Sequence, residues 1–519
     1  MLTKTNFRVA LLGCAAAALL GACTGADGVA SPGVGAFVPP PTAPPPPAPP
    51  PPTAPPPTGG PAADCPAGFS NVGIVANQRI CQLPSTITGN LVVPERAGTI
   101  YSVAGQTRVG IDLGPDPSTP LPGGAQGVLT IEPGVTIFGN SGLDYLLVNR
   151  GSLIFAEGEA DKPIIMTSRQ SVEGTTNDNS IGQWGGLVIN GRAPSTDGCP
   201  GGITTLPNIA CEAQVEGSNA FYGGLSTADN SGRIRYLRVM YSGFEIAPNN
   251  ELNGITLAGV GSGTVFEYVQ VHNSSDDGIE IFGGNVNLKY IVITGSDDDQ
   301  FDTDSGWRGA AQFGIAYQRL GGGDFGFETS SRGTNTAGTT SFFTRPTYAN
   351  WTVVQRTQSS GAGQRRAGIV HNTGHVGQVF NSVVTANNGV QCLQVATAST
   401  LSNANNFGGS GPVYQSVHMS CDGGPVLGSA PITNAQVEAI LDANVNNVKT
   451  GTSTLVNGFI NGANENAVTA TNITAIAGNT LPPAVASFLT PVDYIGAVRD
   501  ANDTWYQGWT CGLPTTPAC

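Results

Sequence analysis

Four short segments of this chain repeat at a nearly constant spacing. They begin at residues 255, 279, 301 and 325, and each alternates an inward apolar residue with an outward one. Alternation with a period of two is typical of a β-strand. A strand of four residues buries its apolar side only by stacking on further copies of itself. The repeat therefore predicts an all-β chain, built of the coils of a parallel β-helix.

Stacking fixes which outward side chains meet on successive coils, because neighbouring strands lie about 4.8 Å apart. The alignment places Glu280 over Asp302, and Asp304 next to Glu328. Further strands with the same pattern are expected at 129–132, 135–138, 146–148, 153–155, 164–166, 234–239, 351–354, 369–371 and 379–384.

A second set of strands supports the period. The segments 268–271 and 290–293 match at the same spacing, and 236–239 has the same pattern, with a tyrosine at the start of each. The three tyrosines are expected to stack as a structural ladder. A platform on which sugar rings stack is the alternative.

Composition narrows the class of protein and its partners. The chain has 72 glycines and 38 prolines, and only 11% of its residues are charged, which suits many tight turns between short strands. Its net charge of −14 argues against nucleic acid as a partner, because that binding needs a basic face. The acidic balance fits cation binding, or simple solubility.

The first residues have the pattern of an export signal. Lys4 and Arg8 precede an uncharged apolar run at 9–20, which ends in Leu-Gly-Ala-Cys at 20–23. This tetrapeptide resembles the bacterial lipobox, so residues 1–22 are expected to be removed and Cys23 to be lipidated (diacylated, with palmitate-type chains). Thr24 after the cysteine favours sorting to the outer membrane, with the periplasmic or surface face left open. The sequence therefore predicts an exported protein attached to the membrane through a lipid anchor.

The anchor is followed by a spacer and then by the folded part. Residues 23–63 comprise the lipidated cysteine and a Pro-rich linker, expected as stiff polyproline II. Residues 64–519 are expected to form the β-helix with terminal caps. A short helix is predicted near 434–443, capped by Thr433, on the end or side of the solenoid. Trp505, Trp509 and the last two cysteines are expected to cap an exposed end.

Eight cysteines remain after the signal and the lipidation site, and an even number in an exported chain indicates disulfides. Proximity in sequence favours four local pairs, and no CxxC spacing supports a metal site. The expected disulfides are Cys65–Cys81, Cys199–Cys211, Cys392–Cys421 and Cys511–Cys519.

Carboxylates are concentrated between residues 276 and 328. Neighbouring carboxylates a few ångströms apart raise one another's pKa, so this column needs a compensation for its negative charge. A cation with six to eight oxygen ligands would provide it, and Ca²⁺ fits best. Shared protons, or pairing with Lys289 or Arg308, are a second possibility. The candidate calcium ligands are Asp276, Asp277, Glu280, Asp298, Asp299, Asp302, Asp304 and Glu328.

The same column could instead carry catalysis or hold a sugar by hydrogen bonds. An acid/base pair of carboxyl groups would serve a glycosidase, and a Ca²⁺-assisted β-elimination would use Arg308 as its base. The candidate catalytic residues are Asp277, Glu280, Asp299, Asp302 and Arg308. Trp307 is either a sugar platform or packing in a turn. His272 and His371, which each end a strand, are interpreted as structural.

Several motifs resemble a family of exported bacterial right-handed parallel β-helix proteins, many of them lipoproteins without an assigned activity. These motifs are GVLTIEPG, NRGSLIFAEG and DKPIIMTS between 127 and 168, QWGG at 183, NGITL at 253, DDGIE at 276, FDTDSGW at 301 and TPVDYIGA at 490. The wider fold includes pectate lyases and polygalacturonases. The segment 273–279 faintly resembles the paired-aspartate segment of polygalacturonases, but Asn-Thr-Asp, Gly-His-Gly and Arg-Ile-Lys motifs are missing, so that activity is not expected.

Two functions follow from these observations. The first is a monomeric, lipid-anchored β-helix that binds carbohydrate, matrix or a surface protein through one lateral face, with Ca²⁺ stabilising the acidic coils. The second is an enzyme, a lyase or glycosidase, acting on an anionic polysaccharide. An enzyme would need basic groups to receive a uronate, and the column is overwhelmingly acidic, which favours the binding protein.

Overall fold

A computed structural model gives the fold of most of the chain. It describes residues 59–200, 206–248, 250–331, 342–356, 367–405, 407–473, 475 and 481–519. The predicted signal peptide, Cys23 and the linker up to residue 58 lie outside the described residues.

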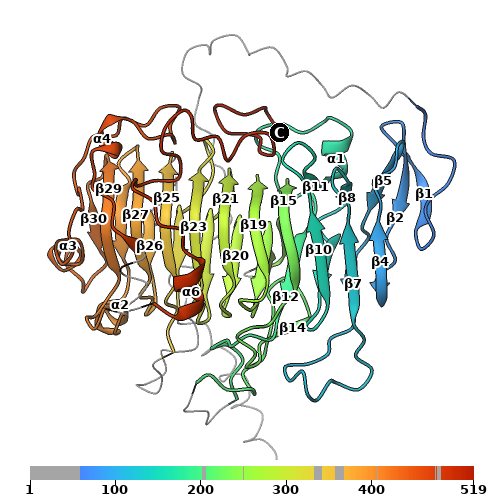
Figure 1. Cartoon of the computed structure of the whole chain (residues 1–519), viewed down its shortest axis with the longest axis horizontal. Coiled ribbons are helices and arrows are strands. Elements are labelled where there is room, and N and C mark those ends of the chain that lie inside the picture. The colour runs from blue at the N-terminus through green and yellow to red at the C-terminus, as the bar shows by residue number, and fades with distance from the viewer. Residues whose placement is uncertain are drawn as a thin grey trace, which may run out of the picture. The chain divides into compact units, whose positions relative to one another are not determined.

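Two long sheets of parallel strands form the solenoid, and Figure 1 shows their arrows side by side in chain order. Among the described residues the first sheet comprises β1 (Ser70–Val75), β2 (Gln78–Gln82), β4 (Gly89–Val93), β5 (Thr99–Ser102), β7 (Gly127–Ile131), β8 (Thr136–Gly139), β10 (Leu153–Glu157), β11 (Ile164–Ser168), β15 (Gly232–Met240), β19 (Val265–His272), β21 (Asn287–Thr294), β23 (Ala310–Tyr317), β25 (Thr347–Gln355), β27 (Gln378–Ala386) and β29 (Val413–Cys421). The second comprises β3 (Thr86–Ile87), β6 (Gln106–Val109), β9 (Tyr145–Val148), β12 (Gly186–Asn190), β18 (Ile255–Ala258), β20 (Ile279–Phe282), β22 (Phe301–Asp304), β24 (Phe327–Thr329), β26 (Ala367–His371), β28 (Gln391–Val395) and β30 (Val426–Gly428).

This arrangement is a right-handed parallel β-helix, as the sequence predicts. Successive coils contribute to both sheets, and among the described strands of these sheets only the first hairpin, β1 with β2, pairs antiparallel. Two small hairpins, β13 (Ala213–Gln214) with β14 (Phe221–Tyr222) and β16 (Phe244–Ala247) with β17 (Asn250–Leu252), lie before and after β15 in the chain. The helices of the described residues are α1 (Arg169–Val172), α2 (Ala398–Ser402), α3 (Asn434–Asp442), α4 (Ala463–Asn466) and α6 (Pro483–Phe488).

The register of the repeat is confirmed for three of its four strands. Ile255 pairs with Ile279, and Ile279 with Phe301, and all three are fully buried in one core. The fourth strand begins later than predicted, because Phe327 rather than Phe325 pairs with Phe301. The predicted contact of Asp304 with Glu328 is therefore wrong, and Glu328 lies beside Asp302.

A bend divides each long strand of the first sheet. One residue in its middle has a positive φ, and these residues follow one another from coil to coil: Tyr236, Tyr268, Tyr290, Phe313, Asn350, Asn381 and Ser416, with φ between 47° and 60°. Left-handed backbone turns the strand through a corner, so one continuous strand supplies two sides of the coil. The second sheet closes the cross-section as its third side.

The predicted tyrosine ladder lies on this bend. The rings of Tyr236 and Tyr268 stack at 4.5 Å, those of Tyr268 and Tyr290 at 4.4 Å, and Phe313 extends the stack at 5.1 Å. The ring faces are occupied by one another, which confirms the structural interpretation. Trp509 meets Tyr236 and Tyr268 edge-on.

The C-terminal segment, which we call the strap (residues 445–519), does not cap an end as predicted for Trp505 and Trp509. It runs back along the side of the solenoid, as Figure 1 shows for its red part. At its start the Val445 carbonyl accepts a hydrogen bond from the Ser416 N–H, and near its end Trp505 packs on Tyr290. The end is instead capped by the predicted helix, α3, whose Thr433 forms a capping box and which packs on β29 and β30.

All four predicted disulfides are present, and each closes a short loop. Two tie the ends of the fold: Cys65–Cys81 lies at the first hairpin, and Cys392–Cys421 joins neighbouring coils near α3. No described helix has the length and apolar run needed to cross a bilayer.

Candidate functional site

Three carboxylates form a ladder on the outward side of the second sheet. Glu280, Asp302 and Glu328 are register partners on β20, β22 and β24. Thr256 continues the column on one side and Val370 on the other. The alternation of the strands creates the ladder, because the residues before and after each acid point into the core. The ladder is thus confined to three consecutive coils.

A second acidic ladder lies in the turns that lead into these strands. The Asn253 side chain accepts a hydrogen bond from the N–H of Asp277 at 3.2 Å, and the Asp277 side chain accepts one from the N–H of Asp299 at 2.9 Å. Asp299 in turn accepts from the Phe325 N–H at 2.6 Å. Each side chain therefore ties its own turn to the next coil. These bonds explain why the acids recur in the turns, and they hold one oxygen of each carboxylate in place.

The two ladders bring carboxylate oxygens close enough to share a cation. Those of Asp276, Asp277 and Asp298 lie within 4.8 Å of one another, and so do those of Asp277, Glu280 and Asp302. Asp277 belongs to both groups. Ligands made only of oxygen suit a hard cation such as Ca²⁺. Clusters of this kind could hold a metal ion.

Burial makes the charged forms of these acids costly. It is the main cause that raises the pKa of Asp276, Asp277, Asp299 and Asp302 well above the usual range, and neighbouring carboxylates add to it. The pKa of Glu328 is raised to about 7, mainly by burial. Asp302 shares a hydrogen bond with Glu280, and Glu328 shares one with Asp299. Such bonds between carboxyl groups need a shared proton, or a cation in its place.

Three glutamates that the sequence pattern did not indicate extend the acidic site. Burial is the largest cause that raises the pKa of Asp276, and the next causes are the charges of Glu216, Glu251 and Glu245. Glu245 and Glu251 are direct partners across β16 and β17, an arrangement in which like charges destabilise a hairpin. All three precede the column in the sequence and stand outside the repeat, so no periodic signal would have found them.

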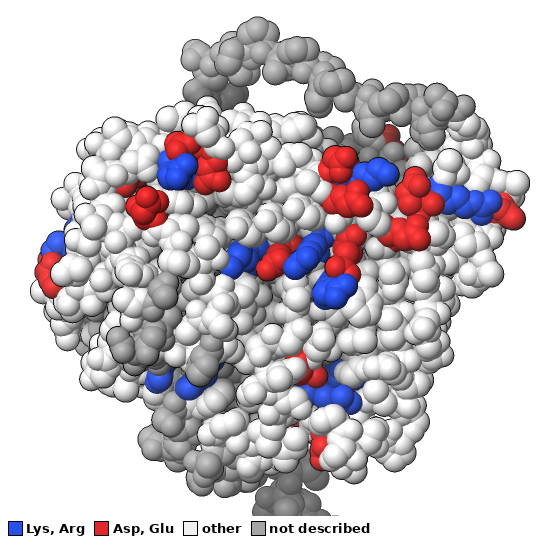
Figure 2. All heavy atoms as spheres, in the orientation of Figure 1, with Lys and Arg blue, Asp and Glu red and all other residues white. Residues whose placement is uncertain are grey.

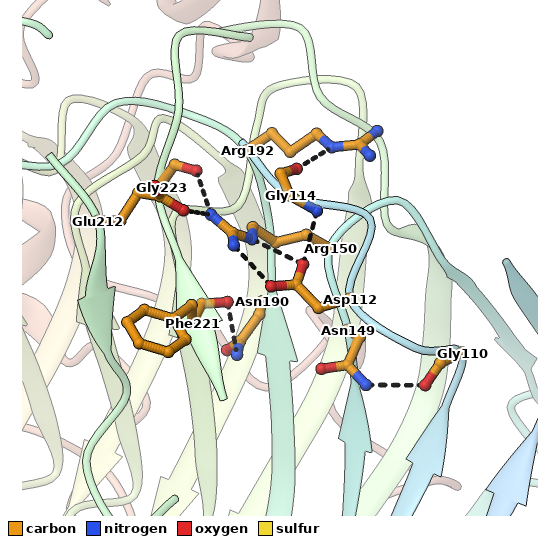
Figure 3. Close-up of polar contacts among 10 residues, drawn as sticks. All are labelled: Gly110, Asp112, Gly114, Asn149, Arg150, Asn190, Arg192, Glu212, Phe221 and Gly223. Atoms are coloured by element: carbon orange, nitrogen blue, oxygen red, sulfur yellow. Dashed lines mark hydrogen bonds and ion pairs between the residues drawn. The ribbon is translucent and has the colours of Figure 1, made fainter. Parts of the chain in front are cut away.

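A buried arginine positions the insertion that carries Glu216. Figure 3 shows Arg150 between two loops, with Asp112 bound at 2.9 and 2.6 Å and Glu212 at 2.5 Å. Arg150 also donates to the Gly223 carbonyl at 3.1 Å. Beyond it, Tyr222 of the same insertion packs on Phe282 of β20. The insertion thus covers the outward side of the second sheet beside the acids.

The two cations considered as partners for the column have their described contacts elsewhere. Lys289 is on the first sheet and donates to the Phe488 carbonyl at 2.7 Å, so it does not neutralise the acids. Arg308 follows β22 in the chain and donates to the Phe343 carbonyl at 3.1 Å, with its guanidinium against the Phe342 ring. Burial lowers the pKa of Arg308 to about 9, and the positive charge of Arg345 makes a smaller contribution in the same direction.

The other residues singled out in the sequence have structural contacts. Asp304 is buried at the far end of β22, where its Oδ1 accepts from the Ser305 N–H. Trp307 is fully buried, and its indole donates to the Val286 carbonyl, which establishes packing. His272 and His371 end their strands as expected, and desolvation lowers the pKa of each to about 3, so both are neutral.

A column on the first sheet balances its own charges. Glu157, Arg235, Glu267 and Lys289 are register partners on four strands, and Figure 2 shows a row of alternating sign across this face. Arg235 and Glu267 form an ion pair at 3.1 Å. Alternation of sign compensates the charges of this column, whereas Glu280, Asp302 and Glu328 follow one another on the second sheet with no basic residue between them.

Comparison with known proteins agrees with this architecture. None of the curated proteins and none of the solved structures gives a significant match. The family model described as a pectate-lyase-like β-helix domain matches residues 121–510, which include both ladders and most of the strap. Such a domain fits the binding or degradation of carbohydrate. The chain therefore belongs to the pectate-lyase-like β-helix family.

Proposed function

We propose that this protein is a carbohydrate-binding β-helix of the bacterial outer membrane, lipid-anchored through Cys23, with a Ca²⁺-type cation held by its acidic column. The observation that carries the proposal is the sharing of Asp277 by two groups of carboxylates within 4.8 Å. Buried acids on three coils need a positive charge or shared protons. Several carboxylate oxygens close together favour a hard divalent cation.

The exposure of the site supports binding at its surface. Asp277 and Glu280 are buried, whereas Asp276, Asp298 and Asp302 are half-buried. A cation held by these groups would keep part of its coordination open toward solvent and would attract an anionic sugar. The carboxylates alone would repel a uronate, so we expect carbohydrate binding to depend on the cation.

Thermal unfolding of the mature chain in EDTA and in excess Ca²⁺ tests the proposal, together with calorimetric titration of uronate polysaccharides. We expect Ca²⁺ to raise the melting temperature and to be required for polysaccharide binding. An unchanged melting temperature would contradict the cation site. A rise without polysaccharide binding would leave a structural ion and contradict the carbohydrate function.

A lyase is the second candidate, because burial lowers the pKa of Arg308 to about 9 and so makes its neutral form more accessible than usual. The described contacts of Arg308 lie with Phe342 and Phe343 rather than with the acids. Ultraviolet absorbance of an unsaturated product in the same samples would reveal β-elimination. Its loss in Arg308→Lys would assign the base.

Attachment to the membrane has its own test. Cys23 follows the predicted signal, so Cys23→Ser should release the protein from the membrane fraction without changing its melting temperature. Mass spectrometry of the N-terminal peptide should show the diacyl modification in the parent protein. A soluble, unmodified parent protein would contradict the anchor.

A further inference from the structure

Side-chain amides of the solenoid hold the strap at several points through its backbone. Gln270 donates to the carbonyl of Cys511 at 2.6 Å and accepts from the N–H of the same residue at 3.0 Å. Gln312 makes the same pair of bonds to Thr490, at 2.7 and 2.8 Å. These amide clamps are fully buried on β19 and β23. Both polar groups of one strap residue are thus satisfied by one side chain.

The same pattern recurs at other coils. Asn381 donates to the carbonyl of Thr471 at 3.0 Å and accepts from its N–H at 2.7 Å. Arg238 donates twice to the Trp509 carbonyl, at 3.1 and 2.8 Å. Hydrogen bonds to the peptide groups of an extended segment are the means by which many peptide-binding grooves hold their ligands. The side of the solenoid therefore has the chemistry of such a groove.

Apolar contacts between strap and solenoid accompany these backbone bonds. Trp509 and Leu513 of the strap pack with Val292 and Ile315, which are outward residues of the first sheet. The edge of Trp509 meets the tyrosine ladder, and its indole donates within the strap to the Trp505 carbonyl at 2.8 Å. Backbone bonds together with apolar side-chain contacts combine affinity with specificity.

The last part of the strap is separable from the solenoid in its covalent structure. Its disulfide, Cys511–Cys519, closes within the strap, and the other three disulfides lie before it in the chain. Among the described residues, the first long sheet ends at β29 and the second at β30, before the strap begins. Removing residues 503–519 would therefore take away no described strand and no cross-link of the solenoid.

We infer that the side of the solenoid is a peptide-binding groove, occupied by the chain's own residues 503–519, and that the same segment of a second copy can take their place. A second copy is the partner because its own residues 503–519 would bring the same Trp505, Trp509 and Leu513 to the ring and apolar contacts of the solenoid, and the same backbone to the clamps. This inference does not depend on the acidic column or on its proposed function.

The test uses the full chain with a protease site inserted after Asn502, which is exposed together with Ala501. After cleavage, we expect residues 503–519 to remain bound through gel filtration, and a fluorescent synthetic peptide of the same residues to exchange with them. This peptide has the sequence of the segment that a second copy would supply.

Two variants make the test specific. Gln270→Ala removes a clamp on the released fragment and should speed its loss by about tenfold to hundredfold, since two hydrogen bonds are lost. Gln312→Ala is the matched control, because its clamp holds Thr490 in the part that stays covalently attached. Its fragment should be lost at the parent rate.

Three results would overturn the inference. They are immediate loss of the fragment from a solenoid that keeps its circular dichroism, unfolding of the cleaved protein, and equal loss from the Gln270 and Gln312 variants. Retention with exchange, sensitive to Gln270 alone, would establish the groove.

Discussion

At Glu328, burial opposes the charged form and raises the pKa to about 7, from 4.5 for an ordinary glutamate. The folded state therefore holds the proton more tightly than the unfolded chain does. The resulting stability is complete below about pH 4.5 and is lost as the pH rises through about 7. Without a cation, we expect the free energy of unfolding to fall over this range, on the order of 3 kcal/mol for Glu328 alone.

Urea unfolding in EDTA between about pH 5 and pH 8 measures this fall. Because a cation replaces the proton as the compensating charge, Ca²⁺ should remove most of the loss at the alkaline end. A stability in EDTA that rises with pH would contradict the raised pKa of the column.

Asp302 distinguishes a cation from a proton as the partner of the ladder. Asp302→Asn keeps the shape of the side chain and removes one charge beside Glu280 and Glu328. We expect it to raise the free energy of unfolding in EDTA at pH 8, by relief of repulsion, and to lower it in Ca²⁺, by loss of a ligand, each by about 1–3 kcal/mol. Chemical denaturation in both buffers tests this opposite response. Asp161→Asn, at an exposed acid, should change neither value.

At the scale of the element, the aromatic ladder stabilises the bend of the first sheet. Tyr268 stacks on rings at 4.5 and 4.4 Å on its two sides. Tyr268→Ala should cost about 3 kcal/mol, from lost ring contacts and the cavity left between Tyr236 and Tyr290. Tyr268→Phe keeps the ring and should cost less than about 1 kcal/mol. Chemical denaturation of both variants measures the difference, and equal losses would assign the stability to the hydroxyl group.

The elements show how far the sequence predicts this fold. The period is visible wherever the turns have similar lengths, as from Ile255 to Phe301, so the column of Glu280 and Asp302 follows from it. The next interval, from Phe301 to Phe327, is longer than the one before it. The pattern at 325–328 alternates in the same phase, so the pattern alone could not reveal a slip by one full alternation.

The candidate site is predictable only in part, for a related reason. Residues that repeat with the coils, such as Asp277 and Asp299, are found by alignment. Glu216 and Glu251 are brought in by insertions whose length and direction follow no repeat, and Arg150 fixes one of these insertions through a contact to Glu212 that is distant in sequence. Only the tertiary structure connects them to Asp276.

At the scale of the whole molecule, the strap changes how the coils depend on one another. In a solenoid each coil contacts only its neighbours, so stability is close to a sum of local terms and one end can unfold first. Here one segment crosses the coils from Ser416 back to Tyr236 and adds contacts between distant coils. The strap should therefore make unfolding more cooperative than the coils alone would.

This cooperativity can be measured by removing two clamps without touching the strands' core. In a Gln270→Ala, Gln312→Ala double variant we expect a urea transition with a lower slope, and a tryptophan fluorescence midpoint below that of circular dichroism, because the strap carries Trp505 and Trp509. Thr433→Ala, which breaks the capping box of α3, is the control and should lower the free energy of unfolding by about 1 kcal/mol with an unchanged slope. If fluorescence and circular dichroism of the double variant still gave one midpoint, with the slope of the parent protein, the core alone would couple the coils. The inward stacks of side chains from Ile255 to Trp351 would then transmit the coupling without the strap.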